Sequence, residues 1–337
     1  MPRRSILIAL LVLLAAGAAY TAWWLHLAGL VRERVEAWAA EERARAGLVE
    51  YRDLEIGGFP FRIAADTQAV RLVRPDGTEW RGESAAAWAR PWNPGEIHVA
   101  LAGTQSLVLP ETELTAAGAT GRISLEAGRF RSGRFALRDV AVGLPGGRFR
   151  AAGLNVAATP TGPAATGISI GVAGLDLPEE LEAPLGRTIE AADVEAVIEG
   201  PLPGRADPAS ILGWAEQGGA LRVDAAELRW GPLGLAGQGR IGFDAALRPS
   251  GSLVTEAEGV EPALDALAAT GALRERDAAI AKAALGLLTQ RRASDGAPVV
   301  EATLTLQDGW LYLGPVRLLP LPPLDVLLGR VRPASPR

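Results

Sequence analysis

The chain begins with an uninterrupted apolar segment. Two arginines precede an uncharged run from Ser5 to Val31. A helix rises about 1.5 Å per residue and the hydrocarbon core of a bilayer is roughly 30 Å thick, so about 20 residues suffice to cross it. The pattern predicts a cytoplasmic N-terminus at residues 1–4 and a transmembrane anchor over residues 5–26. Trp23 and Trp24 then fall where an interfacial aromatic belt is expected.

A cleaved signal peptide is the alternative interpretation of this segment. Its apolar core would run from Ile6 to Ala15, and residues 16–18 (AGA) would be its small-residue cleavage site. Apolar character continues past residue 18 without a proline, which favours retention as an anchor. Both alternatives deliver the rest of the chain to the extracytoplasmic side. We therefore expect a protein of the bacterial inner membrane, with the bulk of the chain in the periplasm.

The apolar run continues into a segment with helical periodicity. Apolar residues recur at spacings of three to four, while charged residues fill the other face; the apolar ones are Leu27, Leu30, Val31, Val35, Trp38 and Ala39. This pattern predicts an amphipathic stalk helix over residues 27–47. The helix either carries the body away from the bilayer or packs against its own domain, and the sequence leaves both open.

From residue 48 onward the dominant period is two. Apolar residues alternate with polar or small ones in several short runs, over residues 61–65, 97–101, 123–125, 168–172, 241–247 and 300–306. One apolar and one solvated face are typical of an antiparallel sheet. Turn signals such as residues 75–77 (PDG) and 145–147 (PGG) separate these runs. The sequence predicts a mainly β fold over residues 48–328: a curved antiparallel sheet forming an open roll or groove.

The apolar phase slips within some predicted strands, across residues 138–139 and again between Val223 and Leu228. Such a slip turns side chains to the other face unless a bulge absorbs it, so we expect bulges and strong curvature. Helices are few and are expected near residues 207–217, after an Asp207-Pro208 start, and near 262–290. Residues 329–337 are expected to form a flexible tail.

Composition excludes several classes of function. The chain has no cysteine and only two histidines, which removes thiolate metal sites and cysteine nucleophiles and leaves little for a zinc enzyme. A net charge of −5 provides no basic surface for nucleic acid. The GxGxxG at residues 237–242 precedes strand and turn residues rather than a helix, so it does not predict a nucleotide site. We expect no catalytic residues, no metal, no cofactor and no enzymatic activity; a hydrolase would need two carboxylates that the sequence cannot place together.

Two sets of motifs resemble a known family. The segment 51–62 (YRDLEIGGFPFR) follows the apolar segment and the stalk, and the segments 227–235 (ELRWGPLGL) and 308–315 (DGWLYLGP) lie toward the other end. The first resembles an uncharacterised, membrane-anchored family of unknown function common in alphaproteobacteria. The C-terminal stretch resembles that family too and, more loosely, AsmA-like envelope proteins. The resemblance implies a curved sheet with an apolar groove and a role in moving or sensing envelope lipids; this chain is too short to span a periplasm in an obvious way.

Together these patterns predict a single-pass membrane protein whose strands line a groove for lipid acyl chains. The few helices cannot cover the whole apolar face, so a lipid is a candidate to fill the remainder. The alternative is a non-enzymatic assembly factor that docks another envelope protein through its sheet edge or a Trp-rich surface. The residues expected to line the groove are Phe59, Phe61, Ile97, Val99, Leu101, Ile123, Leu125, Ile168, Ile170, Trp230, Ile241, Phe243 and Trp310.

Overall fold

The computed structural model describes residues 2–45, 47–109, 112–144, 147–181, 183–201, 208–271, 273–291, 298–313, 316–321 and 323. The expected helix start at Asp207, the turn at residues 145–146 and the tail at residues 329–337 lie outside this part of the chain. The helices of the described part are α1 (Pro2–Ala44), α2 (Pro208–Glu216), α3 (Val260–Ala269) and α4 (Glu275–Leu288).

The strands account for most of the described chain. They are β1 (Leu48–Gly57), β2 (Ile63–Val73), β3 (Glu79–Arg90), β4 (Asn93–Leu109), β5 (Thr112–Glu126), β6 (Arg129–Leu144), β7 (Gly147–Gly162), β8 (Ala165–Asp176), β9 (Thr188–Glu199), β10 (Ala220–Trp230), β11 (Leu233–Phe243), β12 (Pro249–Glu258), β13 (Thr289–Arg291), β14 (Pro298–Gln307), β15 (Trp310–Leu313) and β16 (Val316–Pro320).

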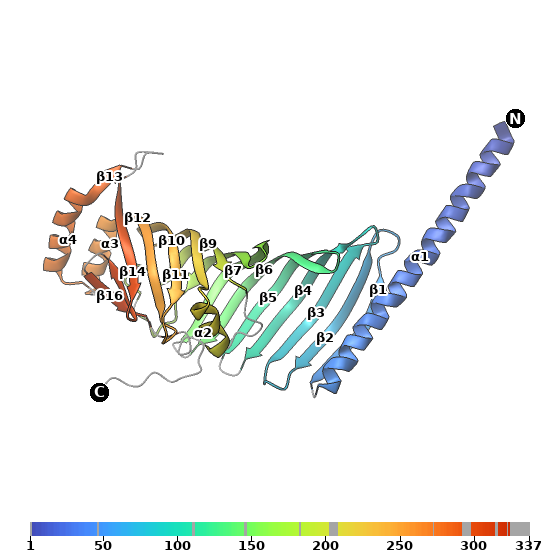
Figure 1. The fold of residues 1–337 in the computed structure, drawn as a ribbon, viewed down its shortest axis with the longest axis horizontal. Helices are drawn as coiled ribbons and strands as arrows, with labels where there is room; N and C mark the ends of the chain where they lie inside the picture. Colours follow the sequence, from blue (N-terminus) through green and yellow to red (C-terminus); the bar gives the residue numbers. More distant parts are fainter. Residues whose placement is uncertain are drawn as a thin grey trace. The chain divides into compact units, whose positions relative to one another are not determined.

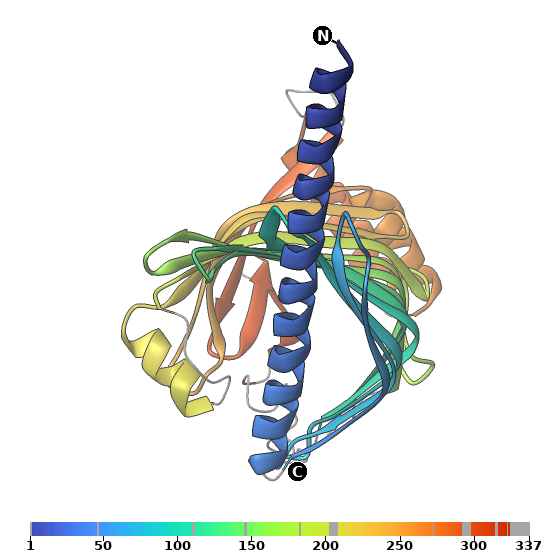
Figure 2. The ribbon, with the colours of Figure 1, turned by 90° about the vertical axis from the view of Figure 1, so that its right-hand side faces the viewer.

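The strands hydrogen-bond in chain order from β1 to β12 and then through β14, β15 and β16, while the short β13 pairs with β14. The strand order is open, with β1 at one end and β16 at the other. Figures 1 and 2 show that the strands are curved. The predicted fold class is therefore confirmed: a mainly β chain with a curved, unclosed antiparallel sheet, few helices and a long N-terminal helix.

The chain divides into two compact units, Met1–Gly133 and Arg134–Arg337. Unit 1 contains α1 and the strands β1 to β5, together with the first residues of β6. Unit 2 contains the remainder of β6, the later strands and the helices α2, α3 and α4.

In unit 1 a bulge in β4 shifts the register with both neighbouring strands. The three-residue step from Ala102 to Gln105 stands opposite a two-residue step in β3 and in β5, and Gly103 within it has a φ of +70°. Because of the extra residue, Val99 projects to one face of the sheet, whereas Leu107, which pairs with Trp80, projects to the other. The apolar face of unit 1 therefore changes side along the strands.

A buried glutamine satisfies the backbone groups that the bulge leaves unpaired. The Gln105 side chain is only 5% exposed. Its Nε2 donates to the carbonyl oxygens of Ala102 at 3.0 Å and Ser84 at 3.3 Å. Its Oε1 accepts from Trp80 Nε1 at 3.2 Å. A buried carbonyl without a hydrogen-bond partner raises the free energy of the folded protein, so the Gln105 side chain stabilises the bulge.

Unit 2 absorbs the predicted phase slips in the same way. Asp139 in β6 has a φ of +49°, and the β10–β11 register shifts between Val223 and Ala226. The helix α2 packs on its strands through Trp214, which is 8% exposed and donates from Nε1 to the carbonyl oxygen of Glu199 at 3.0 Å. The helices α3 and α4 contact each other, and an ion pair between Asp265 of α3 and Lys282 of α4 joins them.

Candidate functional site

The end of the predicted membrane span contacts the turn between β1 and β2. The Tyr20 hydroxyl donates to the carbonyl oxygen of Pro60, and Trp24 Nε1 donates to the carbonyl oxygen of Arg62 at 3.0 Å. The Trp24 ring meets Phe59 edge-on with 5.5 Å between centroids. Two hydrogen bonds and an aromatic pair thus fix the turn to one point on α1.

From this contact toward its C-terminus, α1 runs back along the edge strand β1. Arg32 Nη1 donates to the carbonyl oxygen of Leu54 at 3.5 Å, and Arg43 Nη2 donates to that of Val49 at 3.0 Å. The helix and the strand therefore run in opposite directions, so the residues before Tyr20 continue past the end of the strand. Figures 1 and 2 show this N-terminal part of α1 extending beyond the strands of unit 1.

The projecting part of α1 is apolar and exposed. Its large side chains Leu10, Leu11, Val12, Leu13 and Leu14 are 53–70% exposed. The helix from Leu10 to Ala44 contains a window apolar and long enough to cross a membrane. Such side chains are stable in hydrocarbon and unfavourable in water, which makes this half of α1 suited to a bilayer.

Five of the residues expected to line a groove share one face of β4 and β5. Ile97 pairs with Ile123, and Leu101 pairs with Ala119. Directly paired residues and residues two apart point to the same face. We call this face the apolar strip. Its side chains are partly exposed, except for the buried Ala119. It consists of Ala85, Ala87 and Ala89 of β3, Ile97, Val99 and Leu101 of β4, and Ala119, Ile123 and Leu125 of β5.

The strip begins next to the contact between α1 and the turn. Ile63, the first residue of β2, pairs with Ala89, which pairs with Ile97. The turn residues Phe59 and Phe61 were expected to line the groove with these strand residues. They lie in the turn before β2, outside the paired strand residues of the strip, and are 52% and 72% exposed.

The remaining expected groove residues lie in unit 2. Ile168 pairs with Ala196 and Ile170 with Val194, and Ile170 and Val194 are 38% and 37% exposed. Ile241 lies on the same face, since pairing carries this face across β9 and β10 to β11. This second apolar surface is most open at β8 and β9.

Aromatic residues at the strand ends of unit 2 are arranged differently. Phe243 lies 6.5 Å from the ring of Trp214 and is thus screened by α2. Trp230 Nε1 donates to the carbonyl oxygen of Gly186 at 2.7 Å, which anchors a loop. Trp310 pairs with Gln307, so it points to the face opposite Leu306 and Leu311 rather than joining the apolar face.

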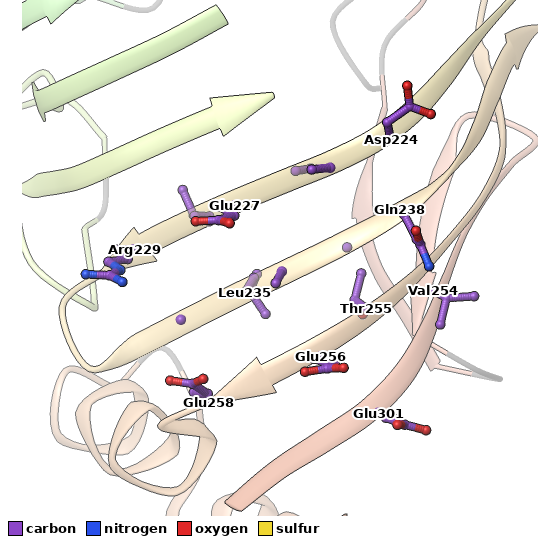
Figure 3. Close-up of a pocket in the computed structure, with 16 residues that line it drawn as sticks. Asp224, Glu227, Arg229, Leu235, Gln238, Val254, Thr255, Glu256, Glu258 and Glu301 are labelled. Atoms are coloured by element: carbon purple, nitrogen blue, oxygen red, sulfur yellow. The ribbon is translucent and has the colours of Figure 1, made fainter. Parts of the chain in front are cut away.

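A hollow of about 640 Å³ lies on unit 2 and is polar (Figure 3). Glu227, Glu256 and Glu301 stand in one row across the strands, with the small Ala236 between the first two. None of the residues expected to bind lipid lines this hollow. The sequence does not predict this hollow, because one carboxylate in one strand is typical of any solvent-exposed strand face. Only the pairing of β10, β11, β12 and β14 places the carboxylates in one row. Its carboxylates make it unsuited to an acyl chain.

The GxGxxG segment, His98 and Asp244 have structural roles. The glycines of the GxGxxG at residues 237–242 lie inside β11, where no helix N-terminus follows to hold a phosphate. His98 stacks on Trp88 with 3.8 Å between ring centroids.

Asp244 lies in the β11–β12 turn, where burial raises its pKa. Hydrogen bonds from the backbone N–H groups of Arg248 and Ala246 and from the Arg248 guanidinium outweigh this effect and hold the pKa of Asp244 below its usual value. Among the described residues, no group of three or more His, Cys, Asp or Glu is arranged to hold a metal ion.

These features define a class of protein: a curved, open antiparallel sheet preceded by one helix long and apolar enough to span a membrane. The chain belongs to a bacterial family described as an uncharacterized protein conserved in bacteria (DUF2125), whose model matches residues 24–322. No curated protein and no solved structure matches the chain.

Proposed function

We propose that α1 anchors this protein in the bacterial inner membrane, that the strands lie in the periplasm, and that the apolar strip of unit 1 binds lipid acyl chains. The observation that carries the proposal is a face made of Ala, Val, Leu and Ile that stays partly exposed and begins beside the end of the predicted span. Covering apolar surface gains about 25 cal/mol per Å². An acyl chain can cover it without needing hydrogen bonds.

The composition of the strip supports this ligand. The β3 residues paired with Ile97, Val99 and Leu101 are alanines, which leaves a low apolar lane beside the larger side chains of β4. The β2 residues on the other side of this lane are Ile63, Ala65 and Thr67. The loose resemblance of the C-terminal stretch to AsmA-like envelope proteins agrees with a role in lipid homeostasis. On this proposal the protein binds and does not catalyse.

Photo-crosslinking in the strand β4 tests the proposal. Benzoylphenylalanine at Val99 faces the strip, whereas the same group at the adjacent Ala100 faces the other side with similar exposure. We expect phospholipid adducts in the mass spectrum after irradiation in membranes from Val99 and not from Ala100. Equal labelling at both positions, or none at Val99, would contradict lipid binding on this face.

The alternative function, docking of another envelope protein, has a distinct outcome in the same experiment. A single dominant protein adduct at Val99 without lipid would favour it. Docking of a partner strand on the edge strand β1 is disfavoured because Arg32 and Arg43 of α1 already donate to carbonyl oxygens of that strand.

A second measurement of lipid binding uses Val99→Asp, with Ala100→Asp as control. We expect the first substitution alone to reduce lipid that co-purifies with the protein.

A further inference from the structure

The exposed aromatic residues of unit 1 outside α1 gather at one end of its strands. In the described part of this unit they are Phe59 at 52%, Phe61 at 72%, Trp92 at 59% and Phe130 at 45% exposed. Phe59 and Phe61 lie in the β1–β2 turn, Trp92 in the β3–β4 turn, and Phe130 two residues after the β5–β6 turn. We call these four residues the aromatic edge.

Strand pairing shows that these turns lie at the same end of the strands. Ile63, at the start of β2, pairs with Ala89 near the end of β3. Ala89 pairs with Ile97 near the start of β4, and Ile97 pairs with Ile123 near the end of β5. The three turns therefore follow one another along the same side of the unit. The turn between β2 and β3, at the other end of the strands, consists of residues 74–78 (RPDGT) and holds no aromatic residue.

Each turn of the aromatic edge also carries an exposed arginine. Arg62 follows Phe61, Arg90 precedes Trp92 by two residues, and Arg129 precedes Phe130. Among the ion pairs of the described residues, none uses these three arginines, whereas Arg131 pairs with Glu126 at 3.0 Å. Aromatic rings beside cationic groups are the composition that favours a membrane interface with anionic headgroups.

The contact with α1 sets the depth of the β1–β2 turn, the first turn of this edge. A span of about 20 residues that begins at Ile6 ends near Leu25. Phe59 touches Trp24, one residue before that end. The β1–β2 turn thus lies level with the boundary between hydrocarbon and headgroups, and the apolar N-terminal part of α1 extends beyond it (Figure 1).

We propose that the aromatic edge inserts into the headgroup interface of the bilayer that α1 crosses, and that Arg62, Arg90 and Arg129 bind the phosphates of anionic lipids there. This rests on the proposed anchoring by α1 and adds a second attachment. Unit 1 is then held at the membrane surface at several points. Acyl chains could reach the apolar strip directly from the bilayer.

Depth-dependent quenching of a fluorescent label tests this in the full-length protein. The chain has no cysteine, so one introduced cysteine carries one environment-sensitive NBD dye. The labelled variants are Phe61→Cys and Trp92→Cys on the aromatic edge, Thr78→Cys at the opposite side, and Val12→Cys within the proposed span. Each protein is reconstituted into vesicles of phosphatidylcholine and phosphatidylglycerol with or without a nitroxide lipid.

We expect the labels at 61 and 92 to show blue-shifted emission and quenching by a shallow nitroxide, and the label at 78 to remain water-like. The label at 12 should be quenched by a deep nitroxide. Quenching at 12 without quenching at 61 and 92 would overturn the insertion while leaving the anchor intact. No quenching at 12 would overturn the anchoring and this inference with it.

A triple variant separates the arginines from the aromatic residues. With Arg62, Arg90 and Arg129 all replaced by Gln, we expect the label at 92 to lose part of its quenching in vesicles with phosphatidylglycerol. In vesicles of phosphatidylcholine alone the triple variant and its parent should give equal quenching. Equal quenching of the two proteins in both vesicle types would overturn the role of the arginines.

Discussion

Trp24 in the N-terminal helix donates from Nε1 to the carbonyl oxygen of Arg62, 38 residues further along the chain, at 3.0 Å. The bond joins a residue at the end of the predicted span to the last residue of the turn before β2. Because Trp24 is 5% exposed, this is a packed contact and not an incidental surface one. It fixes where the first strands stand relative to the apolar half of the same helix.

Replacing Trp24 by Phe should loosen this junction. The substitution keeps an aromatic ring against Phe59 but removes the donor to Arg62, and a typical intramolecular hydrogen bond contributes about 1 kcal/mol. We expect faster amide hydrogen exchange over residues 58–62 by mass spectrometry. Trp23→Phe is the matched control, since Trp23 is 42% exposed. Equal exchange in both variants would show that the bond does not hold the turn.

Replacing Gln105 by Leu should destabilise unit 1 at its bulge. Leucine has a similar size, but it leaves the carbonyl of Ala102 and the Trp80 indole without their partner. An unsatisfied buried polar group costs about 1–3 kcal/mol. Urea unfolding should show a lower midpoint, while the exposed Gln68→Leu in β2 should change it little. A Gln105→Leu protein as stable as its parent would mean that water can replace the amide.

Two glycines near α2 should respond in opposite directions to alanine. A Cβ at Gly219 would lie 2.3 Å from ring atoms of Trp214, so Gly219→Ala should displace that buried ring and cost about 1–3 kcal/mol. A Cβ at Gly213, inside α2, meets nothing within 4 Å. Gly213→Ala should stabilise the helix by up to about 1 kcal/mol. Thermal unfolding of the two variants measures the difference, and a shift of the same sign in both would contradict this packing.

Replacing Asp244 by Asn should lower stability at neutral pH and change its dependence on acid. The pKa of Asp244 in the folded protein lies below its ordinary value of 3.8. A lowered folded-state pKa contributes stability above the ordinary value, and this contribution is lost as the pH falls through the folded-state pKa.

The Asp244→Asn deficit should therefore be present at pH 7 and shrink below about pH 4. Asp244 Oδ2 accepts from Arg248 Nε at 2.7 Å, so the turn loses a charge-assisted bond. Unfolding midpoints across pH measure the effect, with Asp308→Asn in the exposed β14–β15 turn as control. A deficit that does not vary with pH would rule out the charge as its origin.

Several features follow from local sequence. The apolar run before residue 26 predicts a helix suited to a membrane because about 20 apolar residues match the bilayer thickness. Alternation such as Ile97, Val99 and Leu101 predicts strands because the side-chain period of a strand is two. The phase slips near Asp139 and Val223 predict bulges for the same reason, and all of these are properties of neighbours along the chain.

Other features depend on which strands become neighbours, and local sequence does not encode that. Pairing of β2, β3, β4 and β5 brings Phe61, Trp92 and Phe130 to one end of the strands, although they are widely separated in sequence. Pairing also aligns Glu227, Glu256 and Glu301 into a polar hollow and turns Trp310 to the face opposite the apolar one. The sequence by itself determines the elements and their apolar faces, whereas register and the docking of Trp24 decide which surfaces stand together, because those depend on contacts between residues distant in the chain.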